Sequence, residues 1–497
     1  MLKPGANCWR SGVADRAAVL VDMAAYFDAA EIAMRGAKRS IHLLNWSFEP
    51  ETLLHPGPDC SGPDSDRIAN VLIELANKPG LDVRLLCWRS ALPVASTQHF
   101  FPLADRMAFR HTKVKFRLDG RLPAGAAHHQ KMIIIDDALA FCGGGDIGPD
   151  RWDTPQHLDD DPRREKTRYD HKDYDSRHEV MALVDGEPAR ILGELFRERW
   201  RRATGEAIPA PPQAEATAWP GTVKPMFSNA KVGLSRTAAA WRNYAEVREC
   251  EGLHLDAIAA AEDCIYMENQ YFTSPLIAAA LAARLADPNG PEVVLVSTQH
   301  SPSYFDRATM DKTRAVFIRQ LKAADAHGRF AVYSPVTTLG RTIIVHAKTT
   351  IVDDTLLRIG SVNINNRSMG FDTECDLSLE ATDPANKAAV IGLRNHLLAH
   401  WLGCEDARIE AAVAAEGGVR AALESLRLGG HCRIRPIEPV PMGPLARFIA
   451  ANHLGDPIGP DDSWRPWRRK RAIADRLAAA HLSAAPTIPS AESSGPR

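Results

Sequence analysis

The sequence is short of cysteine, of net charge and of long apolar runs. Its 497 residues include 9 cysteines, an odd number without clustered spacing, so neither a disulfide framework nor a zinc ribbon is expected. Lys and Arg total 60 and Asp and Glu total 62, which leaves no overall cationic field to attract nucleic acid. No apolar segment reaches the roughly 18 residues of a spanning helix, and no leader peptide is visible at the start. The expected location is the cytoplasm, with peripheral contact at a membrane as an option.

The remaining composition is that of a globular protein, with 45% hydrophobic and 25% charged residues. The length favours two domains or one large pseudo-symmetric domain. Short apolar runs alternate with helical patterns, which predicts an α/β fold with mixed sheets flanked by helices. Residues 17–34 read as an amphipathic core helix. Strands are expected at residues 40–48, 82–88, 113–118, 131–135, 139–142, 264–268, 292–297, 330–334, 342–352 and 356–359, and further helices at 66–77, 187–202 and 253–261.

Composition shifts suggest where the chain divides. A first half is expected over residues 1–208, with a long polar surface loop at 151–174. The proline-rich residues 209–220 read as a linker, and a second half follows at 221–403. A mainly helical segment is expected at 404–483. The Ser-, Pro- and Ala-rich residues 484–497 are expected to be a disordered tail.

One pattern occurs twice. His-x-Lys, four residues, Asp, six residues and a pair of small residues make up the segments 129–144 and 346–361. In a chain of this length, two chance copies of the His-Lys-Asp part alone are expected on the order of 0.004 times. A constant offset of 217 relates His129 to His346, Lys131 to Lys348, Asp136 to Asp353, Gly143 to Gly360, Gly144 to Ser361 and Asp146 to Asn363.

The residue types of this repeat suit a phosphate group. On a strand the His and the Lys of each motif point to the same face. A histidine can attack phosphorus or carry a proton, and a lysine supplies a fixed cation. If pseudo-two-fold packing brings the halves together, two histidines and two lysines surround one phosphoryl group. One histidine would attack phosphorus and the other would protonate the leaving alcohol, so no metal or other cofactor is needed.

The repeat resembles the motif of the phospholipase D superfamily. Three further segments carry the resemblance: 141–155 (FCGGGDIGPDRWDTP) and 360–376 (GSVNINNRSMGFDTECD), which follow the two motifs, and 265–272 (IYMENQYF), which precedes the second. The resemblance covers about residues 35–400 and is nearest to bacterial relatives of plant and animal phospholipases D. It implies two similar α/β halves with one active site at their interface.

The resemblance also implies roles for individual residues. His129 would be the nucleophile that forms a phosphohistidine, and His346 the general acid; the sequence itself does not distinguish the two. Lys131 and Lys348, together with Asn363, would hold the phosphoryl oxygens. Asp146 stands where Asn363 stands in the second half, as in eukaryotic-type phospholipases. Carboxylates that orient the histidines would be Glu179, where the family more often has Asp, and Glu374.

Other candidate residues belong to structural or binding classes. Asp136 and Asp353 read as turn residues, while Gly143, Gly144, Gly360 and Ser361 are the small motif residues. Candidate substrate-binding residues are Trp152, Glu268, Asn269, Gln270 and Tyr271. The run Asp159–Asp161 could bind calcium, but its spacing favours a solvated loop. Residues 464–471 (WRPWRRKR) combine interfacial tryptophans with a basic run, which suits either a membrane surface or a solvated helix start.

The leading function is phospholipase D activity: hydrolysis of the distal phosphodiester of a glycerophospholipid such as phosphatidylcholine, accompanied by transphosphatidylation. The alternatives are a cardiolipin synthase-type phosphatidyltransferase, a phosphodiesterase or nuclease, and a non-catalytic scaffold. The near-neutral charge argues against a nucleic-acid partner, and the two intact motifs argue against a scaffold. The expected partner is a phospholipid at a membrane surface. Because one chain carries both motifs, a monomer suffices.

Overall fold

The computed structural model describes residues 1–57, 66–90, 101–164, 174–212, 218–429, 433–439 and 442–482. The predicted tail at 484–497 and part of the predicted linker at 209–220 lie outside the described residues. The seven cysteines within the described part are unpaired thiols.

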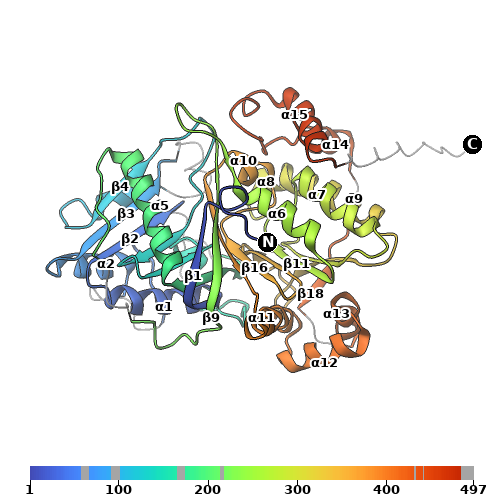
Figure 1. Ribbon diagram of the computed structural model, residues 1–497, viewed down its shortest axis with the longest axis horizontal. Helices are drawn as coiled ribbons and strands as arrows, with labels where there is room; N and C mark the ends of the chain where they lie inside the picture. The colour runs from blue at the N-terminus through green and yellow to red at the C-terminus, as the bar shows by residue number, and fades with distance from the viewer. Residues whose placement is uncertain are drawn as a thin grey trace, which may run out of the picture.

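Two halves of similar construction lie side by side, with strands β1 and β9 between them (Figure 1). Most predicted strands are present, and β3 has the predicted bounds. The first half contains β1 (Arg10–Val21), α1 (Met23–Arg35), β2 (Ser40–Asn45), α2 (Ile68–Asn77), β3 (Asp82–Trp88), α4 (Pro102–Met107), β4 (Lys115–Asp119), β5 (Met132–Ile135), β6 (Leu139–Gly143), the short 3-10 helix η1 (Pro149–Arg151), β7 (Arg177–His178), β8 (Val180–Asp185) and α5 (Glu187–Thr204).

The second half repeats this order and then continues into a mainly helical segment, which surrounds the short strand β18. It contains β9 (Phe227–Ala238), β10 (Val247–Arg248), α6 (Glu249–Ala260), β11 (Cys264–Asn269), α7 (Pro275–Ala286), β12 (Glu292–Val296), α8 (Tyr304–Ala308), α9 (Met310–Ala324), β13 (Phe330–Pro335), β14 (Ile344–Val345), β15 (Lys348–Val352), β16 (Leu356–Gly360), α10 (Asn366–Gly370), β17 (Glu374–Glu380), α11 (Pro384–Leu402), α12 (Asp406–Glu416), α13 (Val419–Leu428), β18 (Ile434–Pro436), α14 (Pro444–Ala451) and α15 (Pro466–Ala479).

The mixed sheets of the two halves join into one continuous sheet. Its strand order is β18-β13-β12-β11-β15-β16-β17-β9-β1-β8-β6-β5-β2-β3-β4, with β10 paired to β9. Read outward from the centre, β1-β8-β6-β5-β2-β3-β4 in the first half matches β9-β17-β16-β15-β11-β12-β13 in the second. Pairing β1 with β9 leaves neither strand as an exposed edge.

The β1–β9 pair obeys the 217-residue offset of the motifs. The two strands pair antiparallel, with Val13 opposite Lys231 and Ala14 opposite Ala230. Lys231 is the equivalent of Ala14, and Ala230 is the equivalent of Val13. Each strand therefore meets the other through the same positions, as in an isologous two-fold interface. The repeat extends from the motifs to the whole architecture.

The prediction of one helix over residues 17–34 is wrong in its first part. β1 runs to Val21 between β8 and β9, and α1 begins only at Met23. Asp22 makes the break with a backbone φ of 66°. The alanines of this segment favour a helix locally, but pairing on both strand edges outweighs that preference.

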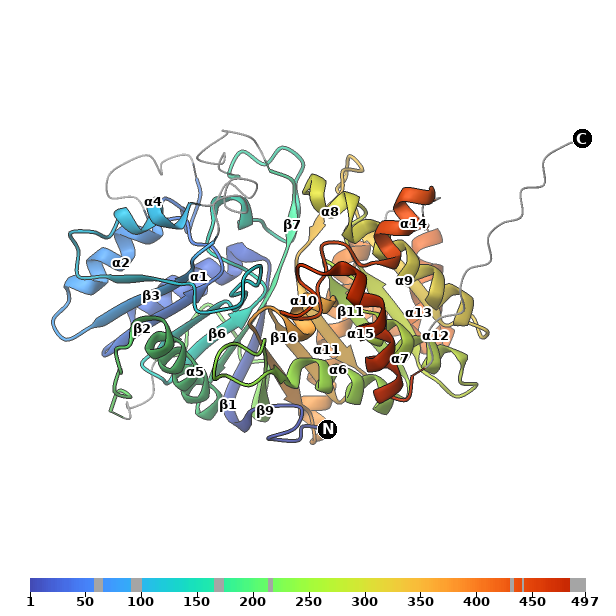
Figure 2. The same ribbon diagram turned by 90° about the horizontal axis from the view of Figure 1, so that it is seen from above.

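Helices cover the sheet and form its hydrophobic cores. One core joins α5 to α11 and α13 across both halves. A second lies beneath α1 and α2, and a third beneath α6, α7 and α9. Figure 2 shows β7 beside the second half, where the two halves meet. There β7 pairs in parallel with β14, the segment just before the second motif. An isolated bridge between His128 and Thr373 binds the segment before the first motif in the same way.

Candidate active site

The two motif histidines occupy equivalent places at the interface. His129 precedes β5 and His346 precedes β15, the first strands of the two β-hairpins. The backbone N–H of His129 donates to the Thr373 carbonyl at 2.8 Å. In the same way the N–H of His346 donates to the His178 carbonyl at 2.9 Å. Each histidine is therefore held by the residue that precedes the carboxylate of the opposite half.

The side chains repeat this crossed arrangement. Nδ1 of His129 lies 3.0 Å from Oε2 of Glu374 and 3.0 Å from the Ser361 carbonyl. Nδ1 of His346 lies 2.6 Å from Oε1 of Glu179. Nδ1 of His129 faces only acceptors and therefore carries the ring proton, which leaves its Nε2 unprotonated. The close contact of His346 with Glu179 lacks the geometry of a hydrogen bond. The imidazoles of His129 and His346 remain 15% and 9% exposed, so both can be reached from outside.

The two lysines lie buried beside the histidines. Lys131 Nζ donates to the His129 carbonyl at 2.6 Å and lies 3.5 Å from Oδ2 of Asp146. Lys348 Nζ donates to the His346 carbonyl. Each ammonium group therefore stands next to the histidine of its own motif. Two cations in one small region suit the non-bridging oxygens of a phosphodiester.

Asp146 and Asn363 occupy equivalent sequence positions but have different surroundings. Oδ1 of Asp146 accepts hydrogen bonds from the backbone N–H groups of Trp46 and Ser47, at 2.9 and 3.1 Å. Asn363 is buried, and its Oδ1 receives no hydrogen bond from the described residues. Asp146 therefore fixes the loop after β2, while the Asn363 amide is available to a ligand.

Burial and the two lysines shift the proton affinities of the site. The pKa values of His129 and His346 lie well below the ordinary range, because the rings are buried next to Lys131 and Lys348. Burial raises the pKa of Glu374 to about 7 and lowers that of Lys348 to about 7. Both histidines are therefore neutral near pH 7 without substrate, which is the state a nucleophilic imidazole needs.

The small motif residues let the halves approach closely. A Cβ on Gly144 would lie 3.1 Å from the His346 carbonyl and 3.0 Å from Oε2 of Glu179. There is no room for a side chain at Gly143 either, because an added Cβ would lie 2.4 Å from the sulfur of Met181. At the position equivalent to Gly144, the Ser361 hydroxyl donates to Glu374. Only one of the two orienting carboxylates therefore has a serine partner.

Asp136 and Asp353 lie in the hairpin turns with φ values of 56° and 52°. The Asp136 carboxylate accepts from the backbone N–H groups at residues 38, 39 and 40, where β2 begins. Asp353 does the same for residues 262, 263 and 264, where β11 begins. Each aspartate therefore fixes its motif hairpin to the neighbouring strand, away from the reacting groups.

The proposed substrate-binding residues have structural partners. Trp152 lies in the hydrophobic core of the first half, with Arg163 stacked over its ring. Glu268 is fully buried and accepts hydrogen bonds from other side chains. Asn269 binds the backbone at residues 271, 362 and 364. Gln270 Nε2 donates to the Tyr271 hydroxyl at 3.0 Å, and that hydroxyl donates to Asp306 at 2.9 Å.

The acidic run in the long loop links two segments. Asp159 accepts from Thr337 Oγ1 at 2.6 Å, and Asp160 pairs with Arg341. Asp161 pairs with Arg163. Asp159 also lies 3.8 Å from Arg341, so the first two carboxylates share one guanidinium and the third has Arg163.

Sequence reasoning missed three residues that contribute to the site. The Trp46 ring lies edge-on to His129, with 6.4 Å between centroids, and 5.9 Å from Lys131 Nζ. The buried guanidinium groups of Arg151 and Arg177 help to lower the pKa of His346. Arg151 lies next to Trp152 in the segment 141–155 that resembles the superfamily. That position could have indicated from the sequence that Arg151 lies near the site.

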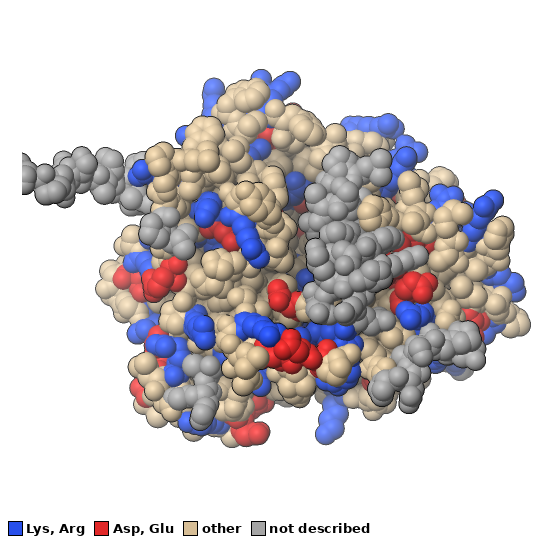
Figure 3. Space-filling view, turned by 180° about the vertical axis from the view of Figure 1, so that it is seen from behind, with Lys and Arg blue, Asp and Glu red and all other residues tan. Residues whose placement is uncertain are grey.

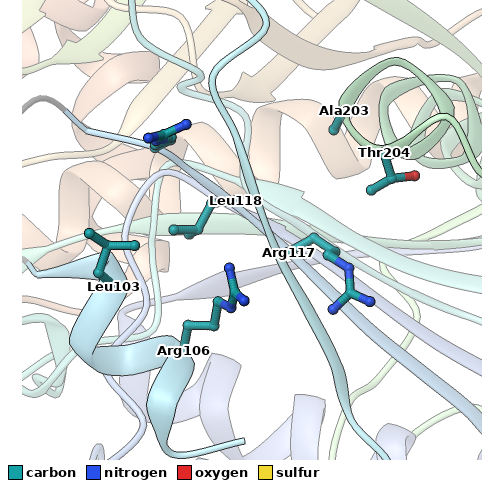
Figure 4. Close-up of a pocket in the computed structure, with 7 residues that line it drawn as sticks. Leu103, Arg106, Arg117, Leu118, Ala203 and Thr204 are labelled. Carbon is teal, nitrogen blue, oxygen red and sulfur yellow. The ribbon is translucent and has the colours of Figure 1, made fainter. Parts of the chain in front are cut away.

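A cavity of about 370 Å³ lies elsewhere, between α4, β4 and the end of α5. Arg89, Arg106 and Arg117 line it together with Leu103, Leu118, Ala203 and Thr204 (Figure 4). None of the motif residues lines this cavity.

Comparisons with known proteins agree with the repeated motif. A family model described as "Cardiolipin synthase, PLD-like domain" matches residues 254–391, which include the second motif. Phospholipase D1 of Saccharomyces cerevisiae is 24% identical over 78% of this chain and 29% of its own length. The chain belongs to the phospholipase D superfamily. Phospholipase D beta 1 of Arabidopsis thaliana is 24% identical over 71% of this chain and 45% of that protein.

A solved structure shares the fold. The phosphatidylserine synthase of Haemophilus influenzae matches 94% of this chain and 93% of its own chain, with a TM-score of 0.51 and 13% identity. This superfamily member spans only about a third of the yeast phospholipases D that it matches. Among the residues that the structure describes, no helix has the length and apolar character to cross a bilayer.

Proposed function

We propose that this chain is a phospholipase D-type phosphodiesterase that cleaves the distal phosphodiester bond of glycerophospholipids. The carrying observation is the crossed site, in which Glu374 orients His129 and Glu179 orients His346 beside two buried lysines. In the first step, Nε2 of His129 attacks phosphorus and forms a P–N bond. The P–O bond to the head group breaks, and the leaving oxygen takes a proton from Nε2 of His346.

The second step reverses the first. Neutral His346 removes a proton from water, whose oxygen attacks phosphorus and displaces His129. The products are phosphatidic acid and the free head-group alcohol. An alcohol in place of water would give transphosphatidylation through the same intermediate. A substrate phosphate would raise the pKa of His346, because it neutralises the charges of Lys131 and Lys348. His346 then takes up from solvent the proton that it donates to the leaving oxygen, while His129 attacks as a neutral imidazole. No metal takes part in these bond changes.

Exposed apolar side chains on the second half support a lipid substrate. Trp464 and Trp467 are 73% and 71% exposed, at the start of the basic helix α15. Leu445 and Phe448 on the neighbouring α14 are also exposed. Tryptophan beside arginine and lysine suits an interface of anionic lipid. On the face shown in Figure 3, Lys and Arg are interspersed with Asp and Glu, unlike a nucleic-acid groove.

A phosphatidyltransferase is the second candidate, favoured by the description of the matching family model. It would use the same phosphohistidine but transfer the phosphatidyl group to the hydroxyl of a second lipid. In either case the chain would act as a monomer at the periphery of a membrane, because both half-sites lie in one chain.

Mass spectrometry of lipid products tests these proposals. The purified chain is given mixed phosphatidylcholine and phosphatidylglycerol vesicles with a little ethanol, in parallel with and without chelator. Phosphatidic acid together with phosphatidylethanol supports the hydrolase, and cardiolipin without phosphatidic acid supports the transferase. Absence of lipid products in both arms would contradict a phospholipid substrate.

A further inference from the structure

Four buried or half-buried side chains converge at a place that the proposed reaction does not use. Asp22 lies between β1 and α1, His157 in the loop after η1, His178 in β7 and His400 near the end of α11. Each offers one nitrogen or carboxylate oxygen, and these atoms all lie within 4.8 Å of one another. Three imidazoles and one carboxylate match the ligand types that zinc and related ions prefer.

The spacing of the ligand atoms suits one small ion. Nε2 of His157 lies 3.0 Å from Nε2 of His400 and 3.7 Å from Oδ2 of Asp22. Nδ1 of His178 lies 2.9 Å from Oδ1 of Asp22. Ligands about 2.0–2.1 Å from a tetrahedral zinc ion are separated by about 3.3 Å. The observed distances lie on both sides of this value, so small side-chain adjustments would complete the coordination.

The atoms behind the cluster are arranged as in metal sites. The second ring nitrogen of His157 bonds to Oδ2 of Asp153 at 2.9 Å. That of His178 bonds to Oε2 of Glu268, also at 2.9 Å. Two of the three proposed histidine ligands thus have a carboxylate behind them, which fixes the tautomer and leaves the other nitrogen to face a metal. This supplies a use for Glu268, which the phosphate site leaves unexplained.

Charge and hydrogen bonding also point to a missing cation. Asp22, Asp153 and Glu268 bring three buried carboxylates, while Arg164 bonds to one of them, Asp153, at 3.2 Å. Oδ2 of Asp22 is buried and receives no hydrogen bond from the described residues. A buried charged oxygen without a partner is costly, and a divalent ion would satisfy it.

We propose that Asp22, His157, His178 and His400 bind one divalent transition-metal ion of the zinc class. The ion is structural and does not touch the phosphate. It would hold His178, whose carbonyl accepts the backbone N–H groups of His346 and Ala347 at 2.9 and 3.1 Å. It would also hold Asp22, whose Oδ1 accepts the N–H of Glu179 at 3.2 Å. The ion thus positions the second histidine–glutamate pair. His400 is only partly buried, which leaves a route for the metal to enter.

Metal analysis of the full chain tests this proposal without reference to activity. The chain is stripped with chelator, loaded with Zn²⁺, desalted and measured by inductively coupled plasma mass spectrometry. One zinc per chain is expected, with a Co²⁺-loaded sample showing the ligand-field spectrum of a tetrahedral ion. His157→Asn and His400→Gln should each weaken Zn²⁺ binding at least tenfold. His55→Gln is the matched control, because His55 belongs to the more exposed group of Glu31, His55 and Asp66; it should leave the stoichiometry unchanged.

Thermal unfolding keeps the proposal testable if a variant fails to fold. Zn²⁺ should raise the Tm of the stripped native chain, because an ion that binds the folded state stabilises it. Loss of zinc binding in His55→Gln, with retention in both cluster variants, would overturn the proposal. So would a native chain that neither retains zinc nor changes its Tm. In that case protonated histidines balance the carboxylates.

Discussion

Nδ1 of His129 lies 3.0 Å from the carboxylate of Glu374, a residue 245 positions later in the other half of the chain. The equivalent contact of His346 runs back to Glu179 in the first half. Each motif histidine is therefore contacted by a carboxylate from the opposite half, and each half-site is completed by the other. This explains why the interface is fixed by backbone pairing on both sides of the site.

Removing the charge of one orienting carboxylate should slow the reaction without unfolding the chain. In Glu374→Gln the side chain keeps its shape, but its amide can present an N–H to Nδ1 of His129 and favour the wrong tautomer. We expect kcat to fall by about 10²–10⁴-fold, with little change in KM. Ser361→Ala removes the hydroxyl that bonds to Glu374 and to the Cys375 backbone but keeps the Glu374 charge, so it should cost less than a tenth of that. Equal losses in the two variants would contradict an orienting role for the Glu374 charge.

The rate should depend on pH through Lys348. Its pKa is lowered to about 7, so the side chain is a cation below that pH and becomes neutral above it. The free enzyme then loses attraction for the phosphodiester as pH rises, and kcat/KM should fall about tenfold per unit on the alkaline side. Lys348→Arg should shift the alkaline fall in kcat/KM to higher pH by more than one pH unit, because arginine stays charged. Lys231→Arg, a surface control, should leave the profile in place.

The exposed tryptophans should matter only at a lipid surface. The double variant Trp464→Ser, Trp467→Ser removes two indoles that would enter the interface, each contributing about 1–2 kcal/mol. Vesicle affinity should fall at least tenfold, while hydrolysis of a short-chain monomeric substrate stays unchanged. Leu428→Ser on α13, equally exposed at 75%, is the control and should bind vesicles normally. Loss of monomer hydrolysis in the tryptophan variant would instead indicate damage to the fold.

Packing at the first motif can be tested through stability. Gly143→Ala would place Cβ 2.7 Å from the Val180 carbonyl, a backbone atom that cannot move aside. The free energy of unfolding should fall by about 1–3 kcal/mol, measured by denaturant titration. Gly221→Ala has open space around it and serves as the control. An unchanged stability for Gly143→Ala would show that β6 and β8 can separate without cost.

The repeated motif made the meeting of His129 and His346 predictable, because the spacing within the motif and the constant offset between its copies are visible in the sequence. The paired strands at 131–135 and 139–142, and at 342–352 and 356–359, were expected from apolar runs around acidic turns. The structure divides the predicted strand 342–352 into β14 and β15. Strand β1 was not predicted, because its alanine-rich segment is held in a strand by pairing with β8 and β9, which are distant in sequence. The cluster proposed to bind a metal was not predicted either, because only the fold brings its residues together. They are Asp22, His157, His178 and His400, from four separate segments with no common spacing. The crossing of Glu179 and Glu374 between halves likewise needed the fold.

The most direct test of the central claim is to trap the covalent intermediate. In His346→Ala no general acid remains, so a phosphodiester with an acidic leaving group can still react with His129, but the next step lacks its base. The protein is digested with protease at neutral or alkaline pH, because acid hydrolyses the P–N bond. Mass spectrometry of the peptides should find the phosphoryl group on the one that contains His129. The double variant His129→Ala, His346→Ala should carry none. A phosphoryl group on another residue, or rapid turnover of His346→Ala without any adduct, would contradict the two-histidine account.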